Sequence, residues 1–64
     1  MTFAIYETGP AGTRYTVAVC ATFKAAERKI QKIGVIHYER DADYPGCADA
    51  MMKDGRVLSV GPIA

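Results

Sequence analysis

Hydrophobic residues recur at spacings of three and four along one stretch of the chain and alternate with polar residues over most of the rest. Four residues carry the helical spacing: Phe23, Ala26, Ile30 and Ile33. They would share one face of an α-helix. Thr22 suits its N-cap, because a threonine hydroxyl can accept from a free backbone N–H of the first turn. Gly34 suits the left-handed residue that ends a helix. The pattern predicts one helix over residues 23–33.

Two alternating segments, residues 2–8 and 14–20, flank a Gly-Pro-Ala-Gly turn. Such segments are typical of half-buried strands. A three-residue loop, with Pro10-Ala11 at the centre of a type I turn and Gly12 left-handed, joins them most simply. The odd number of loop residues would set Ile5 opposite Val17.

The chain after the predicted helix continues as strand and turn. Residues 35–40 form a third strand, and residues 41–46 form a loop in which Pro45 bars regular pairing. Residues 47–53 suit a strand or a short helix, since alanine and methionine favour helices. Residues 57–60 read as the last strand.

The turn between these last segments favours the strand. A loop of Lys53-Asp54-Gly55, with the glycine left-handed, would set Ala48 opposite Val60 and Ala50 opposite Leu58. We therefore expect an α+β class: a two-layer domain with one helix packed on a mostly antiparallel sheet, in the order β-β-α-β-β-β. The alternative, β-β-α-β-α-β, follows if residues 47–53 are helical. A right-handed crossover that sets the third strand beside the first gives the strand order 2-1-3-4-5.

This arrangement assigns the strand residues to two faces. The face beneath the helix is expected to hold Phe3, Ile5, Val17, Val19, Ile36, Tyr38, Leu58 and Val60. The outer face is expected to hold Ala4, Tyr6, Thr16, Ala18, His37, Asp49 and Ser59. A single domain over residues 1–64 has a thin core, and self-association is a common remedy for that.

Composition and charge exclude several classes of protein. Half of the residues are hydrophobic and 23% are charged, as in ordinary globular domains. The net charge of +1 gives no general attraction to nucleic acid or membranes. Apolar runs are too short to span a bilayer, and no signal peptide is evident. Cys20 and Cys47 then suggest two reduced thiols in a cytoplasm.

The candidates for chemistry are few. His37 and Glu39 would point to the same side of a strand, as an acid–base pair requires, yet no serine or cysteine has an evident activating neighbour. Asp41, Asp43 and Asp49 have the spacing of part of a calcium loop, but Pro45 stands where a ligand oxygen is needed. We expect no catalytic, metal-binding or cofactor-binding residue, and no enzymatic activity.

Two surfaces could bind a partner. The flat outer face offers four residues for a protein partner or a second copy: Tyr6, Thr16, Ala18 and His37. The helix exposes four cations against the single acid Glu27: Lys24, Arg28, Lys29 and Lys32. Such a face could contact phosphates. We therefore expect a small non-enzymatic interaction or accessory module that self-associates through its open sheet face or an edge strand. The alternative is a weak nucleic-acid-binding domain that uses the basic helix face.

Residues 47–62, CADAMMKDGRVLSVGP, resemble the end of small uncharacterised bacterial proteins of about this length. The similar positions are the Ala48-Asp49 pair, Gly55 in a turn, and the closing segment Val57 to Val60. The resemblance implies a small stand-alone domain of unknown function, with no catalytic role to carry over.

Overall fold

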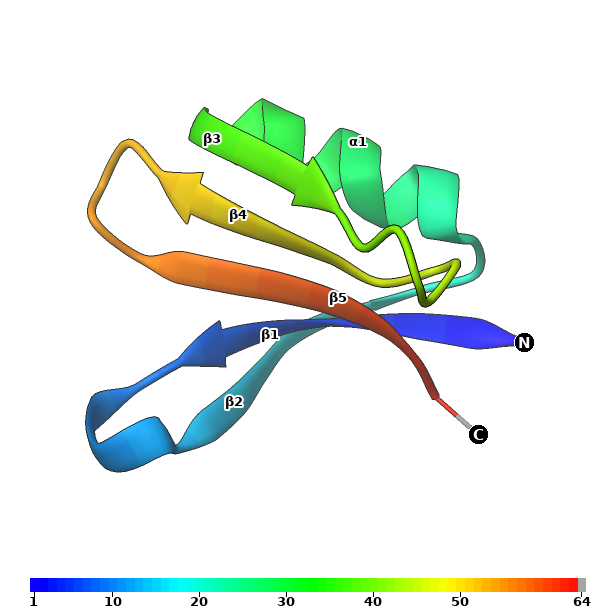
Figure 1. Ribbon diagram of the computed structural model, residues 1–64, viewed down its shortest axis with the longest axis horizontal. Coiled ribbons are helices and arrows are strands. Elements are labelled where there is room, and N and C mark those ends of the chain that lie inside the picture. Colours follow the sequence, from blue (N-terminus) through cyan, green and yellow to red (C-terminus); the bar gives the residue numbers. More distant parts are fainter. Residues whose placement is uncertain (64) are drawn as a thin grey trace.

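A computed structural model describes residues 1–63 (Figure 1). Its elements are β1 (Thr2–Thr8), the short 3-10 turn η1 (Pro10–Gly12), β2 (Arg14–Cys20), α1 (Phe23–Ile33), β3 (Val35–Arg40), β4 (Ala48–Met52) and β5 (Val57–Ile63). The five strands form one antiparallel sheet, and α1 packs on it. This confirms the predicted α+β class, and β4 shows that a strand occupies the ambiguous segment.

The helix begins and ends at the predicted residues. The Thr22 hydroxyl accepts from the Ala25 backbone N–H at 3.0 Å. At the other end, the Gly34 N–H donates to the Ile30 carbonyl at 3.2 Å, and the φ of Gly34 is +118°. Local capping chemistry therefore decides both ends of α1.

The strand order is β2-β1-β5-β4-β3, so the prediction that the third strand lies beside the first is wrong. Figure 1 shows β5 beside β1 and β3 at the far edge. Both orders keep the β3–β4 and β4–β5 hairpins, and they differ in the strand that meets β1. Leu58 and Val60 make β5 suited to the centre, where neighbours cover it. The charged residues of β3, Glu39 and Arg40, suit an edge.

The predicted register of β1 against β2 holds next to the turn, where Tyr6 faces Thr16, and is wrong from Ile5 toward the start of β1. Ile5 faces Ala18 instead of Val17, and Phe3 faces Cys20. Val17 is the extra residue of a bulge, between the pairs Ile5–Ala18 and Tyr6–Thr16. A bulge reverses the alternation of the strand that carries it. For that reason the helix side receives Ala18 and Cys20, whereas Val17 and Val19 are exposed.

The loop between β1 and β2 does not cause this difference, because it sets Tyr6 opposite Thr16, as the predicted loop would. Thr8 pairs with Arg14, which leaves five residues in the loop instead of three. Gly12 is left-handed as predicted, with a φ of +76°, but Ala11 is left-handed too, with a φ of +58°. The loop is closed by the Gly9 N–H, which donates to the Thr13 carbonyl at 2.6 Å.

A second bulge lies in β3, the other edge strand. It falls between Val35 and His37, and it leaves Ile36 70% exposed. Val35 packs against the core together with Tyr38. The expectation that Ile36 lies beneath the helix is therefore wrong, whereas Tyr38 lies where it was predicted.

The β4–β5 hairpin has the predicted register. Ala48 faces Val60, and Ala50 faces Leu58. The turn between them has Gly55 left-handed, with a φ of +92°. Here the turn chemistry and the alternating pattern agree, and no bulge intervenes.

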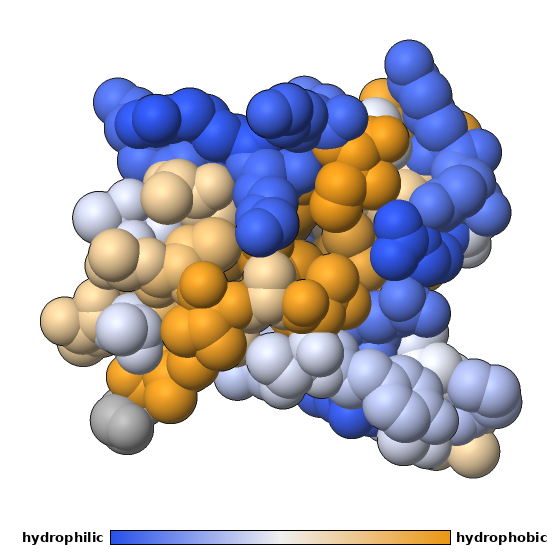
Figure 2. All heavy atoms as spheres, turned by 180° about the vertical axis from the view of Figure 1, so that it is seen from behind, coloured by the Kyte–Doolittle hydropathy of each residue, from blue (hydrophilic) through white to orange (hydrophobic). Residues whose placement is uncertain are grey.

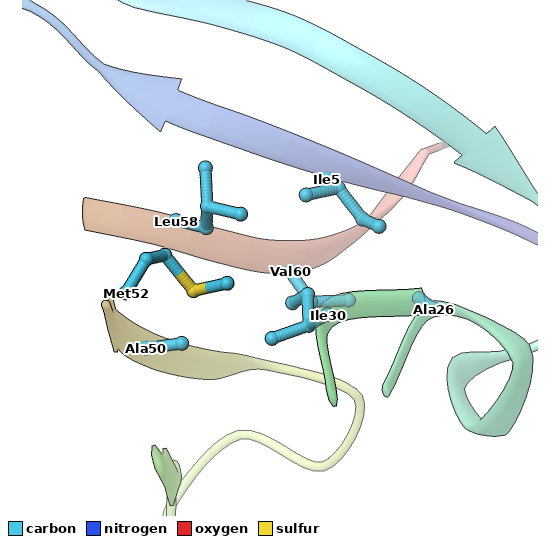
Figure 3. Close-up of a cluster of buried hydrophobic side chains, with 7 residues drawn as sticks. All are labelled: Ile5, Ala26, Ile30, Ala50, Met52, Leu58 and Val60. Carbon is cyan, nitrogen blue, oxygen red and sulfur yellow. The ribbon is translucent and has the colours of Figure 1, made fainter. Parts of the chain in front are cut away.

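The core lies between α1 and the sheet. Seven buried side chains form it: Ile5, Ala26, Ile30, Ala50, Met52, Leu58 and Val60. In Figure 3, Ile30 from the helix points toward the side chains of β4 and β5. Ala4 is also buried, although its alternation places it on the outer face. The helix, β4 and β5 provide two of these side chains each, and β1 provides one. Burial of such apolar side chains is the main stabilising contribution to folding.

Gly46 is a position where we expect a single methyl group to be costly. Its φ is +90°, and an added Cβ would lie 2.9 Å from Cε2 of Phe3. Gly46→Ala should lower the free energy of unfolding by about 2–4 kcal/mol, from left-handed strain and overpacking together. Gly12→Ala is the matched control, because its φ is +76° and no atom lies within 4 Å of the added Cβ. Urea denaturation should show the smaller loss for Gly12→Ala; equal losses would contradict the close approach of Phe3.

Candidate functional site

A stripe of polar residues runs along α1 next to its buried face. Its members follow the spacing i, i+3, i+4 and i+7: Lys24, Glu27, Arg28 and Gln31. This spacing places them on one side of the helix. They line an open groove of about 730 Å³ together with Tyr38, Glu39 and Arg40 of β3. The groove is the first candidate site.

A hydrogen-bonded cluster closes one side of this groove. One oxygen of Glu27, Oε2, accepts from the Tyr38 hydroxyl and from Nε of Arg40, the latter at 2.8 Å. The other oxygen, Oε1, accepts from Nη2 of Arg40 at 3.0 Å. Burial of a carboxylate is costly unless it is paired, and the Glu27 side chain is only 12% exposed. The paired, two-point contact compensates for that burial.

The cluster shifts the proton affinities of its acids. The hydrogen bond from Arg40 lowers the pKa of Glu27, against the effect of burial, and the Tyr38 hydroxyl lowers it further. Burial raises the pKa of Tyr38 to about 12, and the neighbouring Glu27 carboxylate adds to the rise. At neutral pH the cluster therefore holds a carboxylate, a guanidinium and a neutral phenol.

Glu27 lies in a different place from the one expected. The sequence suggested an exposed acid among the helix cations, but the structure buries it against β3. The four predicted cations are all exposed. Lys24 and Arg28 line the groove, whereas Lys29 and Lys32 do not. None of the four forms a salt bridge within residues 1–63.

The outer face of the sheet carries a polar row instead of an apolar surface. Cross-strand pairs connect five residues, one from each strand: Thr16, Tyr6, Ser59, Asp49 and Glu39. The Ser59 hydroxyl donates to Oδ1 of Asp49 at 2.8 Å. The Arg14 guanidinium lies 5.2 Å from the centre of the Tyr6 ring. A hollow of about 370 Å³ lies beside these residues and also reaches Cys47.

The structure separates the four residues predicted to meet a protein partner. Tyr6 and Thr16 are neighbours on the outer face. His37 lies on β3, three strands away from β1, which corresponds to about 14 Å. Ala18 packs on the helix side, because the bulge at Val17 reverses the alternation there. The set is therefore not one surface.

The residues considered for acid–base or metal chemistry have structural roles or are solvated. Nε2 of His37 lies 3.9 Å from Oε2 of Glu39, with both side chains mostly exposed. Oδ1 of Asp41 accepts from the backbone N–H groups of Asp43 and Tyr44, as in a polar turn. Within residues 1–63, no three histidine, cysteine, aspartate or glutamate side chains converge on a point that could hold a metal ion.

The two edges of the sheet differ in character. The exposed apolar side chains of β2 are Tyr15, Val17 and Val19, exposed by 54%, 40% and 59%. From Tyr15 to Cys20 the strand carries no charged residue. The other edge, β3, carries His37 and Glu39. Charged residues protect an edge strand from pairing, so β2 is the less protected edge.

Figure 2 shows the face of the molecule that carries α1. Hydrophilic side chains cover the top of this view, and a band of apolar side chains runs across the middle below them. Phe3, Ala18, Cys20 and Phe23 are partly buried residues that pack against the core. The helix thus leaves part of the apolar layer at the surface.

A comparison with known proteins finds no matching family model, no matching curated protein and no matching solved structure. The helix found within residues 1–63 is not long and apolar enough to cross a membrane. Sequence reasoning missed the cluster of Glu27, Tyr38 and Arg40. The spacing of Glu27 from Lys24 and Gln31 was a usable signal, because it places all three on one stripe.

The pKa of Glu27 leads to a prediction about acid stability. The folded state binds this proton less readily than the unfolded state, whose glutamate titrates near 4.5. The cluster therefore stabilises the fold above that pH, and its contribution is lost as the pH falls through the lower folded-state pKa. Glu27→Gln should lower the free energy of unfolding by about 1–3 kcal/mol at pH 7.

The difference between the parent chain and Glu27→Gln should shrink as the pH is lowered from about 6 toward 2, which urea denaturation at several pH values would measure. Glu39→Gln is the control, because the Glu39 side chain is mostly exposed. A difference that stays constant over this range would mean that the Glu27 carboxylate is not stabilised in the folded state.

Proposed function

We propose that this protein is a non-enzymatic interaction module that self-associates through its edge strand β2. The observation that carries this proposal is the exposure of three apolar side chains on an uncharged edge: Tyr15, Val17 and Val19. An unprotected edge presents unpaired backbone N–H and C=O groups to another strand. The exposed side chains add apolar area to that contact.

The edge is a better candidate than the open sheet face. The outer face is crossed by the polar row that contains Tyr6, Asp49 and Glu39, and Ser59 already pairs with Asp49. A second sheet packed there would bury the Asp49 and Glu39 carboxylates without partners of opposite charge. Burial of unpaired charge is costly, so we expect the outer face to remain exposed to solvent.

A second copy is the occupant that fits β2 most simply. Antiparallel pairing around a twofold axis between Val17 and Ala18 would place Thr16 opposite Val19 of the other copy on the outer side of the sheet, and Tyr15 opposite Cys20 on the helix side. Arg14, the only charged residue of β2, would lie opposite Ala21, just beyond the end of β2 in the other copy. This register pairs side chains that share a face, sets the β-branched residues Thr16 and Val19 opposite one another, and brings no like charges together. The bulge at Val17 keeps the backbone ladder short, so we expect an association in the micromolar range.

Two further features support the proposal. A chain of 64 residues buries only about 60% of the surface that its unfolded form exposes, so additional burial by a second copy is favourable. Cys20 and Cys47 are free thiols, which agrees with a reducing compartment such as the cytoplasm.

Light scattering coupled to gel filtration tests the proposal. The molar mass should rise from 6.9 kDa toward twice that value as the loaded concentration increases from about 1 µM to about 1 mM, by mass action. A mass that stays at one chain throughout this range would refute self-association as the function.

A further inference from the structure

We propose that the groove between α1 and β3 binds a small organic anion, with its apolar body over Tyr38 and its acid group among Lys24, Arg28 and Arg40. The proposal does not depend on self-association, because β3 and β2 are opposite edges of the sheet. The ligand class is a carboxylate or phosphate monoester attached to a flat apolar group.

The cations of the groove are available to such a ligand. Lys24 and Arg28 are exposed and form no salt bridge with residues 1–63. Arg40 uses Nε and Nη2 to bind Glu27, and its side chain is still 68% exposed. A guanidinium carries five N–H donors, so donors remain on Arg40 beyond those that Glu27 engages.

The acids of the groove do not cancel these cations. Both oxygens of Glu27 already accept hydrogen bonds from Arg40, so that pair is close to neutral. Glu39 pairs in register with Asp49, which belongs to the outer row. Glu39 also lines the groove, but the three cations Lys24, Arg28 and Arg40 outnumber the two acids. The remaining field at the groove is positive.

The groove also has the shape and lining that the ligand class requires. Its volume of about 730 Å³ lies within the range of small-molecule sites. The Tyr38 ring is half-buried in its wall, with its hydroxyl fixed by Glu27. The methylene stems of Lys24 and Arg28 offer further apolar contact. An anion without an apolar body would use only part of this surface.

NMR titration of the ¹⁵N-labelled full chain tests the inference with defined probes. The probes are 2-naphthoate, adenosine 5′-monophosphate and the neutral analogue 2-naphthamide. We expect either anion to shift the backbone amides of Gln31 and Tyr38, and 2-naphthamide to bind about tenfold more weakly than 2-naphthoate, since it lacks the charge-assisted hydrogen bonds. The tighter anion identifies the acid group as carboxylate or phosphate.

Two charge reversals on the same helix provide the matched comparison. Lys24→Glu removes a cation that lines the groove, and Lys29→Glu makes the same change in net charge outside it. Lys24→Glu should weaken binding of the preferred anion about tenfold, whereas Lys29→Glu should weaken it less than about twofold at physiological salt.

Three results would overturn the proposal. The first is no shift at Gln31 and Tyr38 with either anion at about 10 mM, which corresponds to negligible affinity. The second is an equal loss of affinity in Lys24→Glu and Lys29→Glu, which would mean that the anion responds to the overall positive charge of the helix and not to the groove. For the third, decathymidylate is added as a further probe. Binding of decathymidylate but of neither small anion, weakened equally by Lys24→Glu and Lys29→Glu, would indicate an extended nucleic-acid surface that uses all four helix cations.

Discussion

Ile30→Ala should leave most of the protein unfolded at 25 °C. Ile30 is fully buried at the centre of the core, where it points toward β4 and β5 (Figure 3). Truncation of a buried isoleucine to alanine costs about 2–5 kcal/mol. A chain of this size is expected to have a net stability of only a few kcal/mol, so the loss is comparable to the whole.

Ile33→Ala is the matched control for this substitution. Ile33 belongs to the same helix and the same apolar stripe, but it is 41% exposed. We expect it to cost less than half as much as Ile30→Ala, because less apolar area is lost from the folded state. Circular dichroism with urea denaturation measures both. Similar losses would contradict the position of α1 on the sheet.

Val19→Lys should convert the associated protein to a monomer. The substitution places a charge on the uncharged edge, opposite the expected position of Thr16 of the other copy, where pairing would desolvate the ammonium group. We expect the dissociation constant to rise by at least about tenfold, the equivalent of 1.4 kcal/mol. Val19 is mostly exposed in one chain, so the fold itself should change little.

Ile36→Lys is the control at the opposite edge. Ile36 is also β-branched and exposed, and it lies on β3. Both substitutions make a closely similar change in charge and size. A difference in association between Val19→Lys and Ile36→Lys would therefore come from the edge that carries the lysine and not from the net charge. Sedimentation equilibrium should show association for Ile36→Lys and not for Val19→Lys. The reverse result would assign association to β3.

The predictions that held were those decided by nearby residues. Thr22 and Gly34 fix the ends of α1 by local hydrogen bonds, and Gly55 fixes the turn that sets the β4–β5 register. The order of the strands depends instead on which end of the β3–β4–β5 meander meets β1. β5 takes the place beside β1 because its central residues are buried between two neighbouring strands. The alternation of residues within one segment does not show which strand will be buried in this way.

Two bulges account for most of the wrong assignments to a face. Val17 and Ile36 are each the extra residue of an edge strand, and each reverses the alternation on one side of itself. A bulge leaves no consistent signature in a run of alternating apolar residues. The left-handed conformation of Ala11 was not predicted either, because it is uncommon for alanine, but it leaves the register of the strands unchanged.

The candidate groove could be predicted only in part. The helix stripe of Lys24, Glu27 and Gln31 follows from spacing alone. Its partners, Tyr38 and Arg40, share the inward face of β3 by simple alternation, but their position beside Glu27 depends on the strand order, which sets β3 at an edge. The pairing of Glu27 with Arg40 therefore required the tertiary structure.

Self-association and anion binding would be compatible in one molecule. Pairing through β2 uses one edge of the sheet, and the groove beside β3 lies at the other. A ligand in the groove would contact neither Tyr15 nor Val19. We expect the binding of 2-naphthoate to be unaffected by Val19→Lys, which separates the two proposals experimentally.

An isotope-filtered NOE experiment tests the central claim most directly. Equal amounts of ¹³C-labelled and unlabelled chain are mixed at a concentration where the molar mass exceeds one chain. The proposed antiparallel register predicts contacts between the Thr16 methyl group of one copy and the Val19 methyl groups of the other, which are directly opposite positions on the same face. Contacts from Met51 and Val57, which are exposed and pair in register on β4 and β5, would contradict the account and assign the interface to the outer sheet face.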